Sequence, residues 1–193
     1  MPTPTASLFQ WHEHLAAFPD LFLGDGADPA GHARERDLLT RLMEEISRLL
    51  PAAHCAVYMV QPDTLDLQVQ AVSDPARQAE LQRIGAEQIR HGLFAWTFKS
   101  GRATIAERQE PAHPRAVAIV PLVTPRSIIG ACLILQDGGC GEFSLDQLAI
   151  LSVLGGQFAA QTENHRQFRK LEEQNRTLET QVRKRTDEQE ATL

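Results

Sequence analysis

The chain has 193 residues, of which 42% are apolar and 23% are charged, and its formal net charge is −6 at pH 7. This length and composition suffice for one sizeable hydrophobic core with short appendages, and they argue against a multidomain enzyme. The negative charge belongs to residues 1–160, because residues 161–193 hold seven Lys/Arg and seven Asp/Glu. A net-acidic body repels phosphate backbones, so we expect no nucleic-acid partner.

No stretch of the sequence approaches the roughly 18 consecutive apolar residues of a membrane span, and residues 1–14 lack the order of a secretory signal. Three cysteines, Cys55, Cys132 and Cys140, are too few for a disulfide framework and suit a reducing compartment. We therefore expect a cytoplasmic protein that does not associate with a membrane.

The first third of the chain predicts a leader, a helix and a hairpin. Residues 1–32 read as an N-terminal leader segment, because a short apolar cluster is followed by a Gly-, Asp- and Pro-rich run. Residues 33–50 carry apolar side chains at helical spacing up to Pro51, on a face that suits either the body's own core or a partner helix. Residues 54–60 and 65–72 predict a hairpin whose second strand alternates apolar and polar residues and therefore lies towards a sheet edge.

The middle of the chain predicts a second helix and a second hairpin. Residues 75–90 indicate a thin, exposed helix, and the aromatic-rich residues 93–98 read as a turn that leads into a short extended piece. Residues 115–123 and 127–137 are nearly continuous apolar runs, which predict the central hairpin of the sheet. Pro121 cannot donate to a strand ladder, so we expect an irregularity there.

The last helix has a clear beginning, because Ser144 and Gln147 form a capping box and Phe143 precedes it as a hydrophobic staple. Gly155 and Gly156 lower helix propensity by roughly 1 kcal/mol each relative to Ala, which indicates close packing rather than a stop. The whole order of elements predicts an α+β fold with a central antiparallel sheet and a long C-terminal helix.

Three stretches resemble the GAF family of small-molecule sensor domains. They are GLFAWTFKSGRAT (residues 92–104), VPLVTPRSIIGACLIL (120–135) and FSLDQLAILSVLGGQFAAQTEN (143–164), and the resemblance covers about residues 33–165. It implies helices on one face of the sheet and a ligand cavity under loops on the other. By position, this cavity would be lined by Tyr58, Phe94, Trp96, Phe98, Thr104 and Ala118. An aromatic cluster at this spacing also fits an ordinary packed core, and the resemblance identifies no ligand or cofactor.

The sequence departs from several specialised members of the family. The Asn-Lys-x-Phe-Asp-Glu signature of cyclic-nucleotide-binding members is absent, and His54-Cys55, although it has the order of a bilin attachment site, stands in the first predicted strand. The family also includes a thiol-based methionine-sulfoxide reductase, but here only Cys140 lies in a Gly-rich loop, and one exposed thiol does not make a redox cycle. No phosphate loop, zinc spacing or nucleophile elbow occurs, so we expect neither catalysis nor a metal site.

Residues 166–193 predict a coiled-coil signalling helix, because Phe168, Asn175 and Val182 take a positions of a heptad repeat. Leu171 and Leu178 take the d positions, and one Asn in an apolar seam is typical of a parallel two-stranded coiled coil. The alternative is a single solvated helix held by i,i+4 charge pairs. The predicted dimer interface comprises Leu42, Ile46, Leu154, Phe168, Leu171, Asn175, Leu178 and Val182.

The run LEEQNRTLETQVRKRT, residues 171–186, resembles the linker that joins bacterial sensor domains to histidine kinase or diguanylate cyclase domains. We therefore expect a sensory module that forms a parallel homodimer and relays a small-molecule or state signal to an output domain. A ligand-free dimerisation and scaffold module is the alternative.

Overall fold

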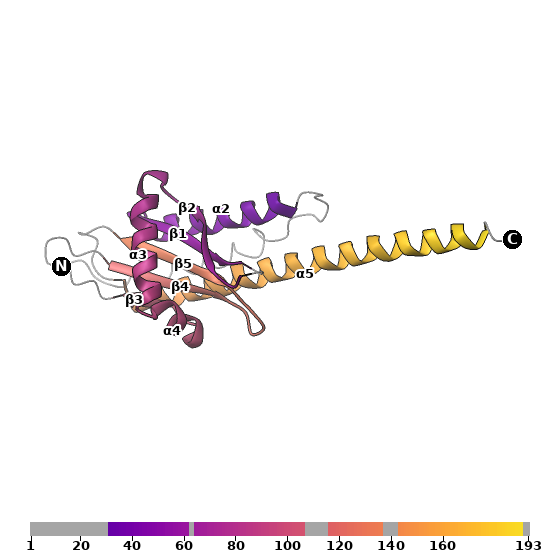
Figure 1. The fold of residues 1–193 in the computed structure, drawn as a ribbon. Helices are drawn as coiled ribbons and strands as arrows, with labels where there is room; N and C mark the ends of the chain where they lie inside the picture. Colours follow the sequence, from indigo (N-terminus) through magenta and orange to yellow (C-terminus); the bar gives the residue numbers. More distant parts are fainter. Residues whose placement is uncertain (1–30, 62–63, 107–115, 137–142, 191–193) are drawn as a thin grey trace, which may run out of the picture. The chain divides into compact units, whose positions relative to one another are not determined.

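The computed structural model describes residues 31–61, 64–106, 116–136 and 143–190 (Figure 1). Its elements are α2 (Gly31–Leu49), β1 (Ala53–Val60), β2 (Leu67–Val72), a 3-10 turn η2 (Pro75–Arg77), α3 (Gln78–Arg90), α4 (Leu93–Ser100), β3 (Thr104–Ala106), β4 (Ala116–Val123), β5 (Ile128–Gln136) and α5 (Leu145–Glu190). None of the helices in these ranges is long and apolar enough to span a membrane.

The five strands form one antiparallel sheet in the order β2-β1-β5-β4-β3. β5 lies at the centre and is buried from Ile129 to Gln136, whereas β2 lies at an edge and alternates between half-buried and exposed side chains. The predicted α+β class, the central position of the second hairpin and the edge position of the second strand of the first hairpin are therefore confirmed. The register between β4 and β5 shifts between Leu122 and Val123, one residue beyond the irregularity expected at Pro121.

Helices cover both faces of the sheet, whereas the resemblance implied helices on one face only. Side chains of α3 and α4, including Leu81, Ile84 and Phe94, share one hydrophobic cluster with Tyr58 of β1 and Leu133 of β5. Figure 1 shows α3 crossing in front of the sheet and α5 running behind it. The segment predicted as an aromatic turn is thus helix α4. Together with α3 it covers the sheet face on which a ligand cavity was expected.

α5 begins at the predicted capping box and approaches the sheet closely. The backbone N–H of Ser144 donates to Oε1 of Gln147 at 2.9 Å, and the N–H of Gln147 donates to Oγ of Ser144 at 3.1 Å. A Cβ on Gly155 would lie 2.5 Å from the carbonyl oxygen of Pro121, whereas a Cβ on Gly156 would meet nothing within 4 Å. Close packing is therefore confirmed for Gly155, and it holds α5 against β4.

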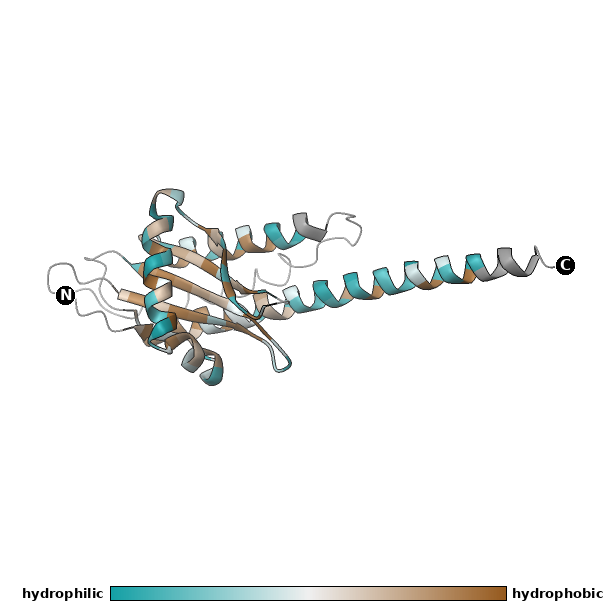
Figure 2. Ribbon diagram, in the orientation of Figure 1, coloured by the Kyte–Doolittle hydropathy of each residue, from teal (hydrophilic) through white to brown (hydrophobic). Residues whose placement is uncertain are grey.

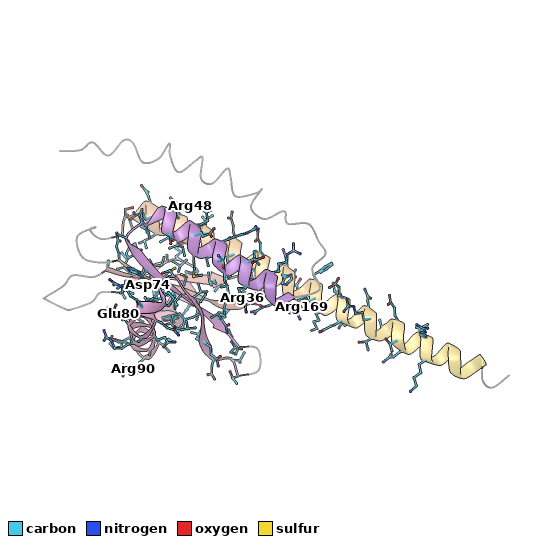
Figure 3. The ribbon with its side chains drawn as sticks, turned by 90° about the horizontal axis from the view of Figure 1, so that it is seen from above. Arg36, Arg48, Asp74, Glu80, Arg90 and Arg169 are labelled. Carbon is cyan, nitrogen blue, oxygen red and sulfur yellow. The ribbon has the colours of Figure 1, made fainter. Side chains whose placement is uncertain are left out.

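α2 lies alongside the first part of α5 (Figure 3), and Arg166 of α5 donates to Glu35 of α2 at 2.7 Å. Leu42 and Ile46 of α2 and Leu154 of α5 are only 6%, 2% and 2% exposed. They were predicted to lie in a dimer interface, but the structure buries all three in the core of the single chain. The cause is that one apolar helix face suits the core of its own chain or a partner helix equally well, and here it is buried within the chain.

Candidate functional site

Three of the six predicted cavity positions fill the face beneath α3 and α4 with their own side chains. Tyr58 and Phe94 are 3% and 2% exposed, and their rings meet edge to face with centroids 5.5 Å apart. Phe98 continues the cluster, with its ring centroid 6.2 Å from that of Phe94. These aromatic rings contact one another, which is the ordinary packed core that the sequence left open as an alternative.

The hydroxyl of Tyr58 ties the sheet to α3. It donates to the carbonyl oxygen of Leu81 at 2.9 Å. A Cβ on Gly85, one turn further along α3, would lie 2.0 Å from this hydroxyl oxygen, so the absence of a side chain there makes room for the ring. Burial, and to a smaller extent the neighbouring Cys132, raises the pKa of Tyr58 to about 12. The phenol is therefore neutral at physiological pH and acts as a hydrogen-bond donor.

Two other predicted positions, Trp96 and Thr104, line a hollow on the surface. The hollow has a volume of about 440 Å³, and its remaining walls are His91, Gly92 and Leu93. Trp96 is 57% exposed, although Phe94 and Thr97 on the same helix are buried. The hollow is wide open to solvent, and the exposed indole of Trp96 forms part of its wall.

Glycines set the two ends of α4 and thereby the direction of its side chains. Gly92 before the helix has φ 74°, and Gly101 after it has φ 65°, both in the left-handed region that favours glycine. No side chain caps the N-terminus of α4. His91, Gly92 and Leu93 were not predicted to line a site, and Gly92 at the helix start was the signal that could have located them.

Ala118, the sixth predicted position, does not join the other five. Its neighbours Val117 and Ile119 belong to the hydrophobic cluster under α3 and α4. Successive side chains of a strand point to opposite faces, so Ala118 lies on the face covered by α5. The structure therefore brings Tyr58, Phe94 and Phe98 together in the core, places Trp96 and Thr104 at the hollow, and separates Ala118 from both.

A hydrogen bond joins α5 to Ala103, the residue that precedes Thr104 at the hollow. The backbone N–H of Ala103, next to Thr104 in the chain, donates to Oγ of Ser152 at 2.8 Å. The Ser152 hydroxyl in turn donates to the carbonyl oxygen of Leu148 at 2.7 Å. A displacement of the α4–β3 connection would therefore reach α5 directly.

α5 carries an exposed apolar seam in its C-terminal part. Every side chain from Leu171 to Lys184 is exposed, and Leu171, Leu178 and Val182 expose 59%, 58% and 62% of their surface. Phe168 is 58% exposed at the beginning of this seam, and Asn175 is exposed within it. Figure 2 shows this part of α5 as mainly hydrophilic, with apolar residues recurring at intervals. The five predicted coiled-coil positions are thus all presented to solvent in the single chain.

The cysteines that the structure describes are buried core residues. Cys55 and Cys132 are free thiols on the adjacent strands β1 and β5. The hydrogen bond to Cys55, together with complete burial, raises the pKa of the Cys132 thiol well above its ordinary value, so it is a poor nucleophile at neutral pH. Cys140, on which the reductase alternative depended, lies outside the described residues. Among the residues described, no group of three or more His, Cys, Asp or Glu side chains is arranged to hold a metal ion.

The sequence profile of the GAF domain matches residues 35–164, about two thirds of the chain. The protein belongs to the GAF domain family. This is a family of sensory and regulatory modules. No curated protein matches the sequence. The matched range coincides with the sheet, α2 to α4 and the first part of α5, so the exposed seam lies beyond this GAF domain.

Solved GAF domains share this fold at low sequence identity. The GAF domain of an Acinetobacter phosphoenolpyruvate-protein phosphotransferase has a TM-score of 0.57 and 13% identity, over 82% of this chain and 95% of that one. The GAF domain/HD domain protein from Geobacter sulfurreducens has a TM-score of 0.54 and 15% identity, over 68% and 94%. The GAF-B domain of DevS from Mycobacterium smegmatis has a TM-score of 0.52 and 16% identity, over 71% and 98%. At these identities the likeness concerns the fold.

Proposed function

We propose that the chain is a cytoplasmic GAF sensor that forms a parallel homodimer along α5. A small molecule or a change of state at the GAF domain shifts α5, and the paired helices carry this shift to an output domain. The resemblance of residues 171–186 to a signalling linker favours a histidine kinase or a diguanylate cyclase as that output domain. The function is regulatory and requires no catalytic residue in this chain.

The observation that carries the proposal is the exposed seam of α5. A helix of 46 residues is several times longer than the usual helix of a globular protein, and its C-terminal half extends beyond the sheet. Exposed Leu171 and Leu178 lie one heptad apart, with Asn175 between them. Pairing with a second copy buries the two leucines and lets the two Asn side chains hydrogen-bond each other.

The seam continues onto the body of the domain along a single face of α5. Exposed Ala149, Ala160, Leu171 and Val182 follow one another at intervals of 11 residues. Eleven residues make three turns of about 3.67 residues each, so these positions stay on one side of a straight helix. Val153, which is 48% exposed, lies on the same side. These residues replace Leu42, Ile46 and Leu154 as the proposed contacts between the bodies of two protomers.

The ligand-free scaffold remains a second candidate because of the filled core. Tyr58 and Phe94 occupy the face where the resemblance implied a cavity. A scaffold requires the α5 seam but no ligand site. The two candidates therefore agree on the dimer and differ only at the hollow beside Trp96.

Cross-linking through single cysteines tests the α5 dimer. In a Cys140→Ser background, Leu178→Cys should form a disulfide-linked dimer under mild oxidation. The matched control is Thr180→Cys, because Thr180 is two residues along α5 and lies on the opposite side of the helix. Equal cross-linking at both positions, or sedimentation of the full chain as a monomer at tens of micromolar, contradicts the proposal.

A charge substitution gives an independent check by sedimentation velocity. Leu178→Asp should weaken the dimer, because two like charges would face each other in an apolar seam. Thr180→Asp introduces the same charge on the opposite side and should leave the sedimentation coefficient unchanged.

A further inference from the structure

We propose that the hollow lined by His91, Leu93, Trp96 and Thr104 binds a small anion that carries a flat aromatic ring. The inference rests on the proposed sensory function and gives the chemical class of its ligand. It places the ligand on the outer side of α4, and not in the core beneath it, which Tyr58 and Phe94 fill.

The walls of the hollow favour a flat apolar group. Its volume of about 440 Å³ lies within the range of roughly 300–1,000 Å³ that is typical of small-molecule sites. The exposed indole of Trp96 provides a surface on which a ring can stack, and half-buried Leu93 links this surface to the core. An indole left 57% exposed gains most from a partner that covers its apolar face.

The charges around the hollow favour an anion. Between Glu87 and Glu107 the chain has no Asp or Glu, although the protein as a whole carries a net charge of −6. Arg90, Lys99 and Arg102 lie in this segment, all three are exposed, and the structure pairs none of them with a carboxylate of the described residues.

The three cations are adjacent to the residues that line the hollow. Arg90 precedes His91 at the end of α3 (Figure 3), and Arg102 lies two residues before Thr104. Lys99 stands three residues after Trp96 on α4, which places the two side chains on neighbouring parts of the helix surface. The uncapped N-terminus of α4 adds partial positive charge at Gly92.

The size of this positive region limits the occupant. Three cations that lie within three residues of the lining in the chain suffice for a small anion, whereas a nucleic-acid backbone needs a longer basic track. α3 carries Glu80 and Glu87 as well as Arg83 and Arg90, so the helix has no net charge and the positive region does not extend along it. A ring with one or two acidic substituents fits both the apolar walls and the charge.

The test compares two dyes that share one ring system and differ in charge. The anion is 8-anilinonaphthalene-1-sulfonate, and the uncharged control is N-phenyl-1-naphthylamine. The protein is the full chain with Trp11→Phe, which leaves Trp96 as the only tryptophan, so that energy transfer from Trp96 reports on the hollow. We expect the anion to bind at one site per chain, about tenfold more tightly than the neutral dye. The affinity for the anion should fall several-fold between about 50 mM and 500 mM salt.

Substitutions locate the binding within the molecule, with calorimetry as the readout for variants that lack Trp96. Trp96→Ala should abolish binding of the anion, and Lys99→Gln with Arg102→Gln should weaken it about tenfold without affecting the neutral dye. The control is Arg126→Gln, an exposed arginine in the β4–β5 turn, which should change neither affinity.

Three results would overturn the inference: equal affinity for both dyes, affinity independent of Lys99 and Arg102, or undiminished binding to Trp96→Ala. Sedimentation of the same samples reports the α5 dimer separately. A monomer that still binds the anion contradicts the dimer proposal alone, whereas a dimer that does not bind it contradicts the ligand site alone.

Discussion

The backbone N–H of Ala103 donates a hydrogen bond to Oγ of Ser152 across 2.8 Å, and it thereby fastens the connection between α4 and β3 to α5. The two residues are 49 positions apart in the chain. Ala103 adjoins Thr104 at the edge of the hollow, and Ser152 lies in the part of α5 that packs on the sheet. Movement at the hollow therefore has a direct route to the helix that we propose as the relay.

Ser152→Ala should lower the free energy of unfolding by about 1–2 kcal/mol, because a half-buried N–H loses its acceptor. Hydrogen–deuterium exchange of the Ala103 amide should become faster in the variant, and the change should be confined to this segment. A purely global loss of stability would instead speed exchange throughout the fold. The matched control is Ser47→Ala on α2. Ser47 makes the same bond to the carbonyl four residues earlier, at 2.8 Å, but is exposed and holds no second element. Equal effects of the two substitutions would contradict the assigned role of Ser152.

Most elements were predictable because each carries a local signal. The capping box at Ser144 gave the start of α5, and the alternation of residues 65–72 gave the edge strand β2. Leu65 itself lies outside β2, because it occupies the turn with φ 60°. The segment 93–100 was harder to predict, since eight aromatic-rich residues between two glycines give little periodicity with which to distinguish a helix from a turn.

The candidate site was less predictable than the fold, because side-chain direction depends on details that positional resemblance does not fix. Within α4, the helical period directs Phe94 into the core and Trp96 outward. On β4, a shift of one residue exchanges the faces, and this placed Ala118 on the side of α5. For Leu42 and Ile46 the sequence defined an apolar face correctly but not whether the sheet or a second copy covers it.

The adjacent glycines of α5 provide a matched pair for testing how closely the helix approaches β4. Gly155→Ala should destabilise the fold by about 1–2 kcal/mol, because the new Cβ would come 2.5 Å from the carbonyl oxygen of Pro121, and the resulting strain exceeds the gain in helix propensity. Gly156→Ala should stabilise the fold by up to about 1 kcal/mol, since nothing lies within 4 Å of its Cβ. Denaturant unfolding of both variants measures the difference, and two substitutions of the same sign would contradict this packing.

Tyr58 is the only tyrosine in the chain, so ultraviolet absorbance of tyrosinate reports on it alone. We expect its titration with a pKa of about 12 in the folded protein and about 10 in denaturant, because burial disfavours the charged phenolate. The raised pKa means that Tyr58 contributes stability below pH 10, which is lost as the pH rises through about 12. Tyr58→Phe should remove this alkaline loss and cost about 1 kcal/mol at neutral pH, where the bond to Leu81 is lost. A midpoint near 10 in the folded state would show that the hydroxyl is solvated.

Asn175 is the polar residue between Leu171 and Leu178 in the seam of α5, at a position where stability alone would favour Leu or Ile. Two Asn side chains can bond each other only in a parallel dimer in the correct register, and other arrangements bury an unpaired amide. Asn175→Leu should therefore strengthen association but make it less specific. Sedimentation equilibrium should detect trimers, and in the Leu178→Cys background shifted registers should give additional disulfide-linked species. Thr180→Leu adds the same side chain on the opposite side of α5 and should leave the dimer uniform. If Asn175→Leu stayed uniformly dimeric and in register, the specificity of pairing would have to come from the body of the domain, where Val153 and Ala160 occupy the same face of the helix.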